Sequence, residues 1–394
     1  NLTDFIPLYK SSKGDITSQY DMKGLEKLGL LKMDFLGLRN LTVIERTLEL
    51  IETNQEKVDI QSISLDDKDV YDLFTKGATI GIFQFESAGM REYLKKLKPS
   101  CIEDLIALNA LYRPGPMNNI DDFINRKQGE KTIDYMHNDL EPILKETYGI
   151  IVYQEQVMQI ANKIAGFSLS DADLMRRAMG KKDSALMKRM KTDFVKGAEK
   201  NNINSQKAKS IFALIEKFAE YGFNKSHSTA YAHIAYQTAW LKTHYPIQFM
   251  SANLTSFMSD TNRIVRLINE CRKLNIQVNP PDINISEIDF QPLDNQSISY
   301  GLNAIKNVGY SALKSITDER EKKGEFKSIF NFCSRVVSSS LNRKVIESLI
   351  KAGALDCLPG KRSELFTSID DVLKYGQSIQ DNQNRNQVDI FGGK

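Results

Sequence analysis

The sequence predicts a mainly α-helical protein with a small β component, an α+β chain divided into more than one domain. Apolar residues recur at helical spacing through most of residues 51–285 and again through 311–375. Strand-like patterns are short and occur near residues 31–35 and 297–300. A length of 394 residues, with 41% hydrophobic and 26% charged residues, suits two or three domains with buried cores.

Composition narrows the function classes. The formal net charge of +3 is too small to indicate a nucleic-acid partner by itself. The four cysteines lie far apart without a Cys-x-x-Cys pair, which argues against a disulfide framework or a zinc site and favours a reducing cytoplasm. No apolar run approaches the length of a membrane span, so we expect no membrane partner. Because the chain opens on Asn1 and ends at Gly-Gly-Lys, we expect a fragment of a longer protein.

The first element is a predicted strand at residues 31–35 within "LLKMDFLGLRN". Its alternation would point Leu31, Met33 and Phe35 into a core, and Lys32 and Asp34 out of the opposite face. One interpretation is a surface ion pair of little energetic value. The other is a carboxylate aimed at a metal ion, with a lysine beside it for phosphate charge.

A basic segment follows the central helices. Residues 176–200 contain nine basic and three acidic residues. The segment begins with Arg176 and Arg177, and Gly180 separates them from Lys181 and Lys182. It could be a solvated helix face, or a glycine beside paired cations could allow close approach of a triphosphate or a nucleic-acid backbone.

Residues 221–246, "YGFNKSHSTAYAHIAYQTAWLKTHYP", predict a long helix with Ser226 or Ser228 as its N-cap. Asn224, Lys225 and His227 gather at the helix start. Unpaired backbone N–H groups and a lysine at a helix N-terminus suit an anion, although His227 alone is also compatible with a structural role.

Residues 148–158, "YGIIVYQEQVM", precede both of these segments. They contain a polar patch of Gln154, Glu155 and Gln156. The patch is compatible with a binding surface and equally with a buried hydrogen-bond network. After it, Pro280 and Pro281 force an extended chain and suggest a boundary.

Two similar turns lie in the last third of the chain. "GLNAIKNVG" places Lys306, Asn307 and Gly309 in an apolar-Lys-x-apolar-Gly turn, and "LIKAGALD" places Lys351 and Gly353 in a related one. Such turns can present backbone N–H groups to DNA phosphates without reading bases. Each is also compatible with an ordinary corner between helices.

The last segment, from residue 378, is rich in Asn, Gln and Asp and predicts a flexible tail. It contains "QVDIF", with Gln387, Ile390 and Phe391. Bulky apolar residues in a polar tail favour a partner whose pocket receives them.

Together these segments resemble the C-family replicative DNA polymerases of bacteria, the DNA polymerase III alpha subunits. The resemblance is carried, in family order, by "GLLKMDFLGLRNLTVI", "TIGIFQFES", "ALYRPGPM", "YGIIVYQEQVMQIA", "LMRRAMGKK", "YGFNKSHSTAYAHIAYQTAWLKTHYP", "PPDIN", "YGLNAIKNVG" and "LIKAGALD". It implies the end of a palm domain at residues 1–50 and fingers at 51–285. It also implies a helix-hairpin-helix, clamp-binding domain at 286–376 and a tail with a clamp-binding peptide at 377–394.

The resemblance implies a role for each candidate residue. Asp34 matches the third of three palm carboxylates that hold two Mg²⁺ ions, and Lys32 the basic residue beside it. The residues that match contacts to the incoming deoxynucleotide (dNTP) are Arg176, Arg177, Lys181, Lys182, Asn224, Lys225 and His227. The two turns, with Lys306, Asn307, Gly309, Lys351 and Gly353, match DNA-binding hairpins. Gln387, Ile390 and Phe391 match a peptide that enters the sliding clamp (the beta subunit). The implied partners are primer–template DNA, dNTP, the clamp and other replicase subunits.

Two departures from the family pattern bear on these expectations. The Asp-x-Asp pair that supplies the other two carboxylates lies upstream of Asn1 in the family, so we expect the fragment alone to be inactive. Asn307 stands where the hairpin pattern usually has glycine, and Asn tolerates the left-handed conformation better than most residues. The alternatives are an error-prone paralogue of the same family and a non-catalytic adaptor that binds DNA and the clamp.

Overall fold

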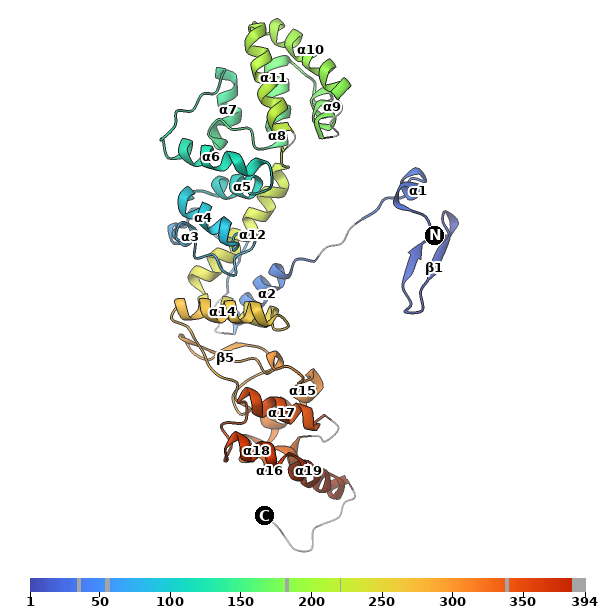
Figure 1. Ribbon diagram of the computed structural model, residues 1–394, viewed down its shortest axis with the longest axis vertical. Helices are drawn as coiled ribbons and strands as arrows, with labels where there is room; N and C mark the ends of the chain where they lie inside the picture. The colour runs from blue at the N-terminus through green and yellow to red at the C-terminus, as the bar shows by residue number, and fades with distance from the viewer. Residues whose placement is uncertain (34–36, 54–56, 181–183, 220, 337–339, 385–394) are drawn as a thin grey trace. The chain divides into compact units, whose positions relative to one another are not determined.

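The computed structural model describes residues 1–394 except 34–36, 54–56, 181–183, 220, 337–339 and 385–394. It confirms the mainly α-helical fold with a small β component (Figure 1). The chain separates into two compact units, Asn1–Arg39 and Asn40–Lys394.

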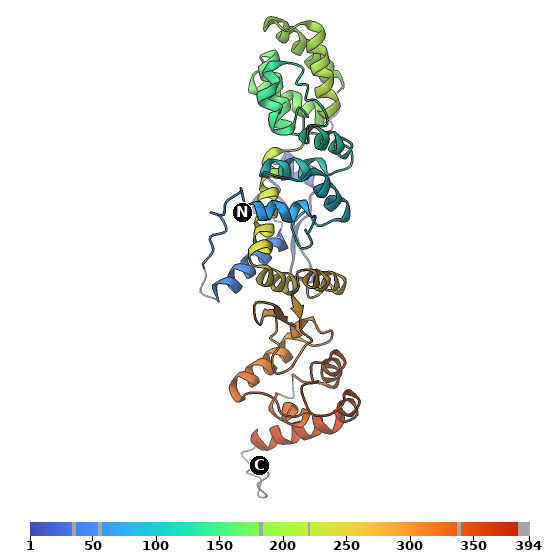
Figure 2. The ribbon, with the colours of Figure 1, turned by 90° about the vertical axis from the view of Figure 1, so that its left-hand side faces the viewer.

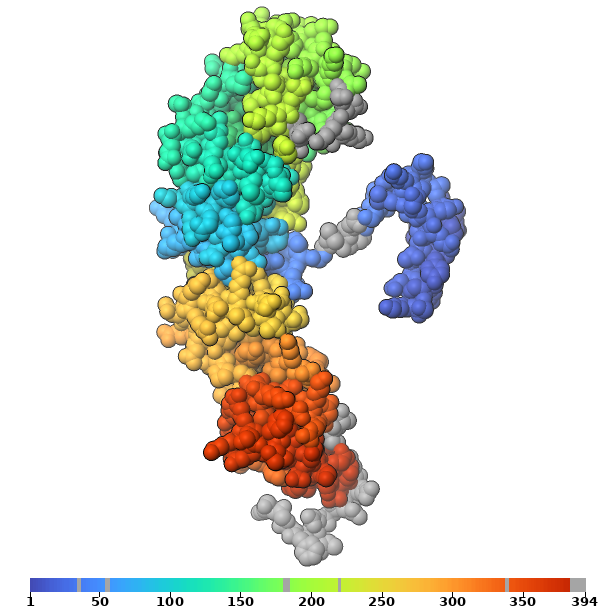
Figure 3. Space-filling model, in the orientation of Figure 1, coloured from blue at the N-terminus to red at the C-terminus, as the bar shows by residue number. Residues whose placement is uncertain are grey.

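The first unit contains little buried apolar surface. Its elements are η1 (Leu2–Asp4), β1 (Leu8–Lys10), β2 (Ile16–Ser18) and α1 (Met22–Lys27), and β1 pairs antiparallel with β2. Figure 3 shows residues 1–33 as a slender body. Among the described residues of this unit, Ile6 is the one buried hydrophobic side chain, whereas Phe5 and Ile16 are more than half exposed.

The predicted strand at residues 31–35 is wrong over its described part. Residues 31–33 form no strand, and Leu31 and Met33 are 83% and 66% exposed instead of facing a core. A strand needs a neighbour for its N–H and C=O groups, and within the described residues β1 and β2 pair only with each other. Asp34 and Phe35 lie outside the described residues.

The second unit begins with a large helical core. The helices around it are α2 (Arg39–Glu52), α3 (Lys68–Thr75), α4 (Ala88–Leu97), α5 (Ile102–Leu111), α6 (Ile120–Lys127), α12 (Lys225–His244), α13 (Pro246–Ser256) and α14 (Thr261–Lys273), with η2 (Pro116–Asn119) before α6. α12 lies beside α3 and α5, as both ribbon views show (Figures 1 and 2). Its fully buried Ala232, Ala235 and Ala239 let the neighbouring helices approach closely.

A second core joins the helices between α6 and α12 (Figure 2). They are η3 (Asn138–Leu140), α7 (Glu141–Leu144), η4 (Lys145–Thr147), α8 (Gln154–Ala165), α9 (Leu169–Gly180), α10 (Ser184–Lys200) and α11 (Ser205–Ala219). Phe194 of α10 and Phe212 of α11 meet in this core with ring centroids 5.3 Å apart. Gly197 is required where α10 crosses α8, because a Cβ there would lie 2.0 Å from the carbonyl oxygen of Ala165.

A small sheet and a third helical core complete the unit. The strand order is β3 (Gln277–Val278), β5 (Ser297–Ser299), β4 (Gln291–Pro292), with β3 and β5 parallel and β4 and β5 antiparallel. The strand expected near residue 297 is therefore confirmed. The helices that follow are η5 (Leu302–Ala304), α15 (Tyr310–Lys323), α16 (Ile329–Arg335), α17 (Arg343–Ala352), α18 (Arg362–Thr367) and α19 (Ile369–Asn384).

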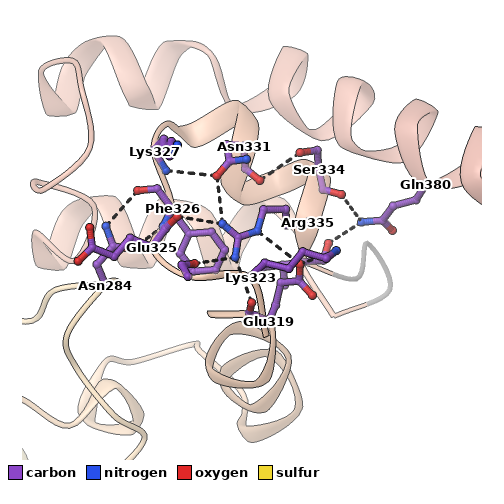
Figure 4. A network of polar contacts seen from close by, with 12 residues as sticks. Asn284, Glu319, Lys323, Glu325, Phe326, Lys327, Asn331, Ser334, Arg335 and Gln380 are labelled. Atoms are coloured by element: carbon purple, nitrogen blue, oxygen red, sulfur yellow. Dashed lines mark hydrogen bonds and ion pairs between the residues drawn. The ribbon is translucent and has the colours of Figure 1, made fainter. Parts of the chain in front are cut away.

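One arginine fixes the loop between α15 and α16 (Figure 4). The Arg335 guanidinium donates to the carbonyl oxygens of Gly324, at 2.7 Å, and Glu325, at 3.0 Å, and lies 4.4 Å from the centre of the Phe326 ring. Gln380 of α19 donates to the carbonyl oxygen of Val336 at 2.6 Å. The Arg335 contacts fix the loop between α15 and α16, and the Gln380 bond holds α19 against the end of α16.

Candidate functional site

The start of α12 is capped by Asn224. Its side-chain oxygen accepts a hydrogen bond from the His227 N–H at 2.8 Å. The N-cap predicted at Ser226 or Ser228 is therefore wrong. Ser228 is fully buried and its hydroxyl donates to the carbonyl oxygen of Ile106 at 2.7 Å, so it ties α12 to α5 instead.

The anion expected at this helix start is matched by two carboxylates of the chain itself. Glu155 accepts hydrogen bonds from Asn224 Nδ2 and from the backbone N–H of Lys225, each at 3.0 Å. Lys225 Nζ lies 2.8 and 2.7 Å from the two carboxylate oxygens of Glu146. Both a cation and the N-terminal N–H groups of α12 therefore attract negative charge.

The paired arginines of α9 lie next to this helix start. Arg176 Nε and Nη2 lie 2.9 and 2.8 Å from Asp173 Oδ1, and Arg177 Nη2 lies 2.7 Å from Asp173 Oδ2. The hydrogen bond that the Arg176 guanidinium donates to Asp173 lowers the pKa of the Asp173 carboxyl. Arg176 Nη1 also donates to Gln154 Oε1 at 3.3 Å.

Gln154 and Glu155 join the two groups of cations. The Gln154 N–H donates to the carbonyl oxygen of Phe223 at 2.9 Å, directly before the α12 N-cap. Arg176 of α9 and Lys225 of α12, 49 positions apart in the numbering, are thus both hydrogen-bonded to neighbouring residues in the first turn of α8. We call the group formed by Arg176, Arg177, Lys225 and their carboxylate partners the cation cluster.

The polar patch at residues 154–156 has two separate roles. Gln156 is buried, accepts the N–H groups of Val152 and Tyr153 at 2.8 and 3.0 Å, and donates to Thr147 Oγ1 at 2.8 Å. The buried-network interpretation is confirmed for Gln156. Gln154 and Glu155 instead contact α9 and α12.

His227 stands beside a row of aromatic rings. It is exposed, and its ring centroid lies 4.2 Å from that of Tyr231 and 5.4 Å from that of Phe223. Arg113, which sequence reasoning did not select, lies 4.2 Å from the centre of the Phe223 ring and donates to the carbonyl oxygen of Tyr221 at 2.7 Å. The sequence signal for Arg113 was its place directly before the Pro114-Gly115-Pro116 loop, where the two prolines restrict the backbone.

The two predicted hairpin turns face a common hollow. Lys306, Asn307 and Lys351 line it together with Tyr300, which follows β5 in the sequence. Asn307 has φ of +66°, so it adopts the left-handed conformation that glycine usually supplies. Gly309 caps α15 at its start, and Gly353, at φ +86°, ends α17.

Several candidate residues lie outside the described residues: Asp34, Lys181, Lys182, Gln387, Ile390 and Phe391. Lys32 is described and exposed. Over the described ranges, no three His, Cys, Asp or Glu side chains are grouped to hold a metal ion. No helix in the described part of the chain is both long and apolar enough to cross a membrane.

Family models match three parts of the chain, and two of them are models of DNA polymerase III alpha domains. The family model of the bacterial DNA polymerase III alpha subunit finger domain matches residues 40–202, and that of the bacterial DNA polymerase III alpha NTPase domain matches residues 1–37. A helix-hairpin-helix motif matches residues 275–365. The chain belongs to the DNA polymerase III alpha family. Arg176 and Arg177 fall in the finger match, and both hairpin turns fall in the helix-hairpin-helix match.

Similar relatives are named DNA polymerase III subunit alpha. The Pseudomonas aeruginosa protein is 46% identical across 100% of this chain and 36% of its own length. The Escherichia coli K12 protein is 46% identical across 99% of this chain and 35% of its own, and the Bacillus subtilis protein 49% across 95% and 34%. The chain therefore spans about a third of the length of these DNA polymerase III alpha relatives.

Proposed function

We propose that this chain supplies the nucleotide-holding and DNA-holding parts of a bacterial replicative DNA polymerase. The complete enzyme would transfer a dNTP to a primer 3′-hydroxyl under direction of a DNA template. The observation that carries the proposal is the cation cluster, in which Arg176 of α9 and Lys225 of α12 are bonded to adjacent residues of α8 and Arg177 shares Asp173 with Arg176. An adaptor that only binds DNA and a clamp has no use for a triphosphate site.

The cations of the cluster suit a triphosphate. Two adjacent guanidinium groups can each bind phosphate oxygens through parallel N–H donors, and Lys225 adds a compact positive charge at a helix N-terminus. His227 and Asn224 border the same position. We propose that Lys181 and Lys182, which continue from α9 in the sequence, extend the phosphate-binding surface.

Two Mg²⁺ ions are the proposed cofactor, with Asp34 as one of three carboxylate ligands and Lys32 beside it. When bound, they would activate the primer hydroxyl and stabilise the leaving pyrophosphate. The described residues do not by themselves fit such a site, because no three His, Cys, Asp or Glu side chains among them lie close enough together to hold a metal ion. We therefore assign the other two carboxylates to the part of the longer family members that this chain does not span. The purified 394-residue chain should extend a primer no more than a metal-free control does.

Two further sites would hold DNA and the clamp. We propose that Lys306, Asn307, Gly309, Lys351 and Gly353 contact the phosphates of primer–template DNA. The support is that Lys306, Asn307 and Lys351 line one hollow.

We propose that the tail after α19 binds the sliding clamp through Gln387, Ile390 and Phe391, in the cytoplasm and alongside other replicase subunits. The helix that precedes this peptide, α19, is held on α16 by the Gln380 bond, so the peptide would be attached to an anchored helix. Alanine at Gln387 and Phe391 should weaken clamp binding by roughly tenfold or more, the scale of losing interface anchors.

The test of the main proposal is nucleotide binding by the complete alpha subunit. Arg176→Ala or Lys225→Ala should each weaken dNTP affinity by roughly tenfold or more, because a charge-assisted hydrogen bond to phosphate is lost. Lys76→Ala, which removes an exposed lysine paired with Asp72, is the control and should leave the affinity unchanged. If both cluster variants bind dNTP as the wild type does, the DNA-binding adaptor becomes the better account.

A further inference from the structure

We infer that Glu146 and Asp173 compete with a triphosphate for the cations of the cation cluster and give up those cations when a triphosphate binds. The inference rests on the proposed function, because it concerns the same cation cluster. In this inference, the two carboxylates lower the affinity of the cluster for a triphosphate.

The first support is that the donors needed by phosphate are already in use. Both carboxylate oxygens of Glu146 lie within 2.8 Å of Lys225 Nζ. Asp173 receives Nε and Nη2 of Arg176 and Nη2 of Arg177. A phosphate group that binds through these nitrogens therefore competes with the carboxylates for the same N–H donors.

The second support is charge. Arg176, Arg177 and Lys225 carry three positive charges, and Glu146, Asp173 and Glu155 carry three negative ones. With every pair formed, the cluster is close to neutral and attracts a triphosphate weakly. Withdrawal of Glu146 and Asp173 would leave a net charge of about +2 at a helix N-terminus, which favours an anion.

The third support is that the exchange is inexpensive. The side chains of Lys225 and Glu146 are 38% and 32% exposed, and those of Arg176 and Asp173 are 33% and 29% exposed. Ion pairs this open to water contribute little to stability. The released carboxylates can turn towards solvent without leaving a buried unpaired charge.

Glu155 has a different role in the same cluster. It accepts hydrogen bonds from the neutral amide of Asn224 and from the backbone N–H of Lys225, which fix the start of α12 on α8. Because these bonds hold the fold of the helix start, Glu155 remains in place as a positioning residue while Glu146 and Asp173 exchange.

The test measures binding of inorganic tripolyphosphate to the 394-residue chain by calorimetry at low salt. Glu146→Gln and Asp173→Asn should each bind the probe roughly fivefold more tightly than the wild type, the scale of one partly exposed ion pair. Glu146→Asp, which keeps the carboxylate, should retain the wild-type affinity. Asp72→Asn, which breaks the remote Asp72–Lys76 pair, is the matched control and should have no effect.

A double variant separates the inference from the proposed function. In a Lys225→Ala background, Glu146→Gln should no longer tighten binding, because the cation that it releases is absent. If Lys225→Ala weakens binding but Glu146→Gln and Asp173→Asn weaken it too or change nothing, the carboxylates are not exchanged and the inference is wrong, while the proposed site stands. If Arg176→Ala and Lys225→Ala bind the probe as the wild type does, the proposed site fails and the inference fails with it.

Discussion

Replacement of Lys242 by methionine tests what holds α12 in the first core. The Lys242 ammonium is inaccessible to solvent and lies 2.7 Å from Glu270 Oε1. It also donates to the carbonyl oxygens of Ala78 and Ile80 at 2.7 and 2.8 Å. Burial lowers the pKa of Lys242, and the Glu270 carboxylate opposes that shift. One side chain therefore joins α12 to α14 and to the loop before α4.

The expected cost follows from what methionine leaves behind. Loss of Lys242 leaves the buried Glu270 carboxylate with the exposed Lys273 ammonium, 3.7 Å away, as an ion-pair partner. We therefore expect a loss of unfolding free energy at the lower end of about 3–5 kcal/mol. In Lys242→Met/Glu270→Met that buried carboxylate is gone, but the Ala78 and Ile80 carbonyls still lack a donor, at about 1–3 kcal/mol. The double variant should therefore recover part of the loss but not all of it.

The chain provides its own probe for this measurement. Its single tryptophan, Trp240, lies in α12 two positions before Lys242. Urea unfolding followed by Trp240 fluorescence reports on the region that the ion pair holds. Lys76→Met, which breaks an exposed pair with Asp72, is the control and should leave the transition where it is. A loss below about 1 kcal/mol for Lys242→Met, or a double variant no more stable than the single one, would refute the reasoning.

Three other predictions address pH, DNA and the C-terminal core. Burial acts to raise the pKa of Asp67, but hydrogen bonds from His244 and two backbone N–H groups together lower it. Since the folded pKa is below the unfolded one, Asp67 stabilises the protein above about pH 4 and that contribution disappears as pH falls. Asp67→Asn should accordingly flatten the fall in urea midpoint below that pH. Lys306→Ala and Lys351→Ala should each reduce the slope of log affinity for duplex DNA against log salt by about 1, measured by fluorescence anisotropy, and unchanged slopes would exclude both as phosphate contacts. Arg335→Ala should cost about 2–3 kcal/mol in urea unfolding, and Arg335→Lys should not restore it because an ammonium lacks the planar fork of donors.

Helix content was predictable because it depends on a short-range pattern. The long runs of helical spacing correspond to α3–α14 and α15–α19, and the strand near residue 297 is β5. The flexible tail predicted from residue 378 is wrong over residues 378–384, because α19 continues to Asn384. The strand predicted at residues 31–35 fails over residues 31–33 because alternation shows only which faces differ. It cannot supply a neighbouring strand or a core, and the exposed Leu31 and Met33 have neither among the described residues.

The candidate site was predictable in its cations and only partly in its carboxylates. Arg176 stood out in a segment of dense positive charge, and Lys225 stood out as a lysine at the start of a predicted helix. Asp173 could have been found, because it lies three residues before Arg176 on one helix face. Glu146 could not, since its contact with Lys225 joins residues 79 positions apart. Such a pair arises only when η4 and α12 pack together.

Both ends of α12 are held to the core, and this bears on how the cation cluster can respond to a nucleotide. Ser228 ties the first turn to α5, and Lys242 ties the last turns to α14. Movement of the whole helix would break these buried contacts, whereas the ion pairs of Glu146 and Asp173 are partly exposed. Exchange of carboxylate for phosphate therefore requires rotation of side chains and not displacement of the helix. A fixed α12 also keeps Lys225 at one position, so the charge that a triphosphate meets depends chiefly on which carboxylates remain.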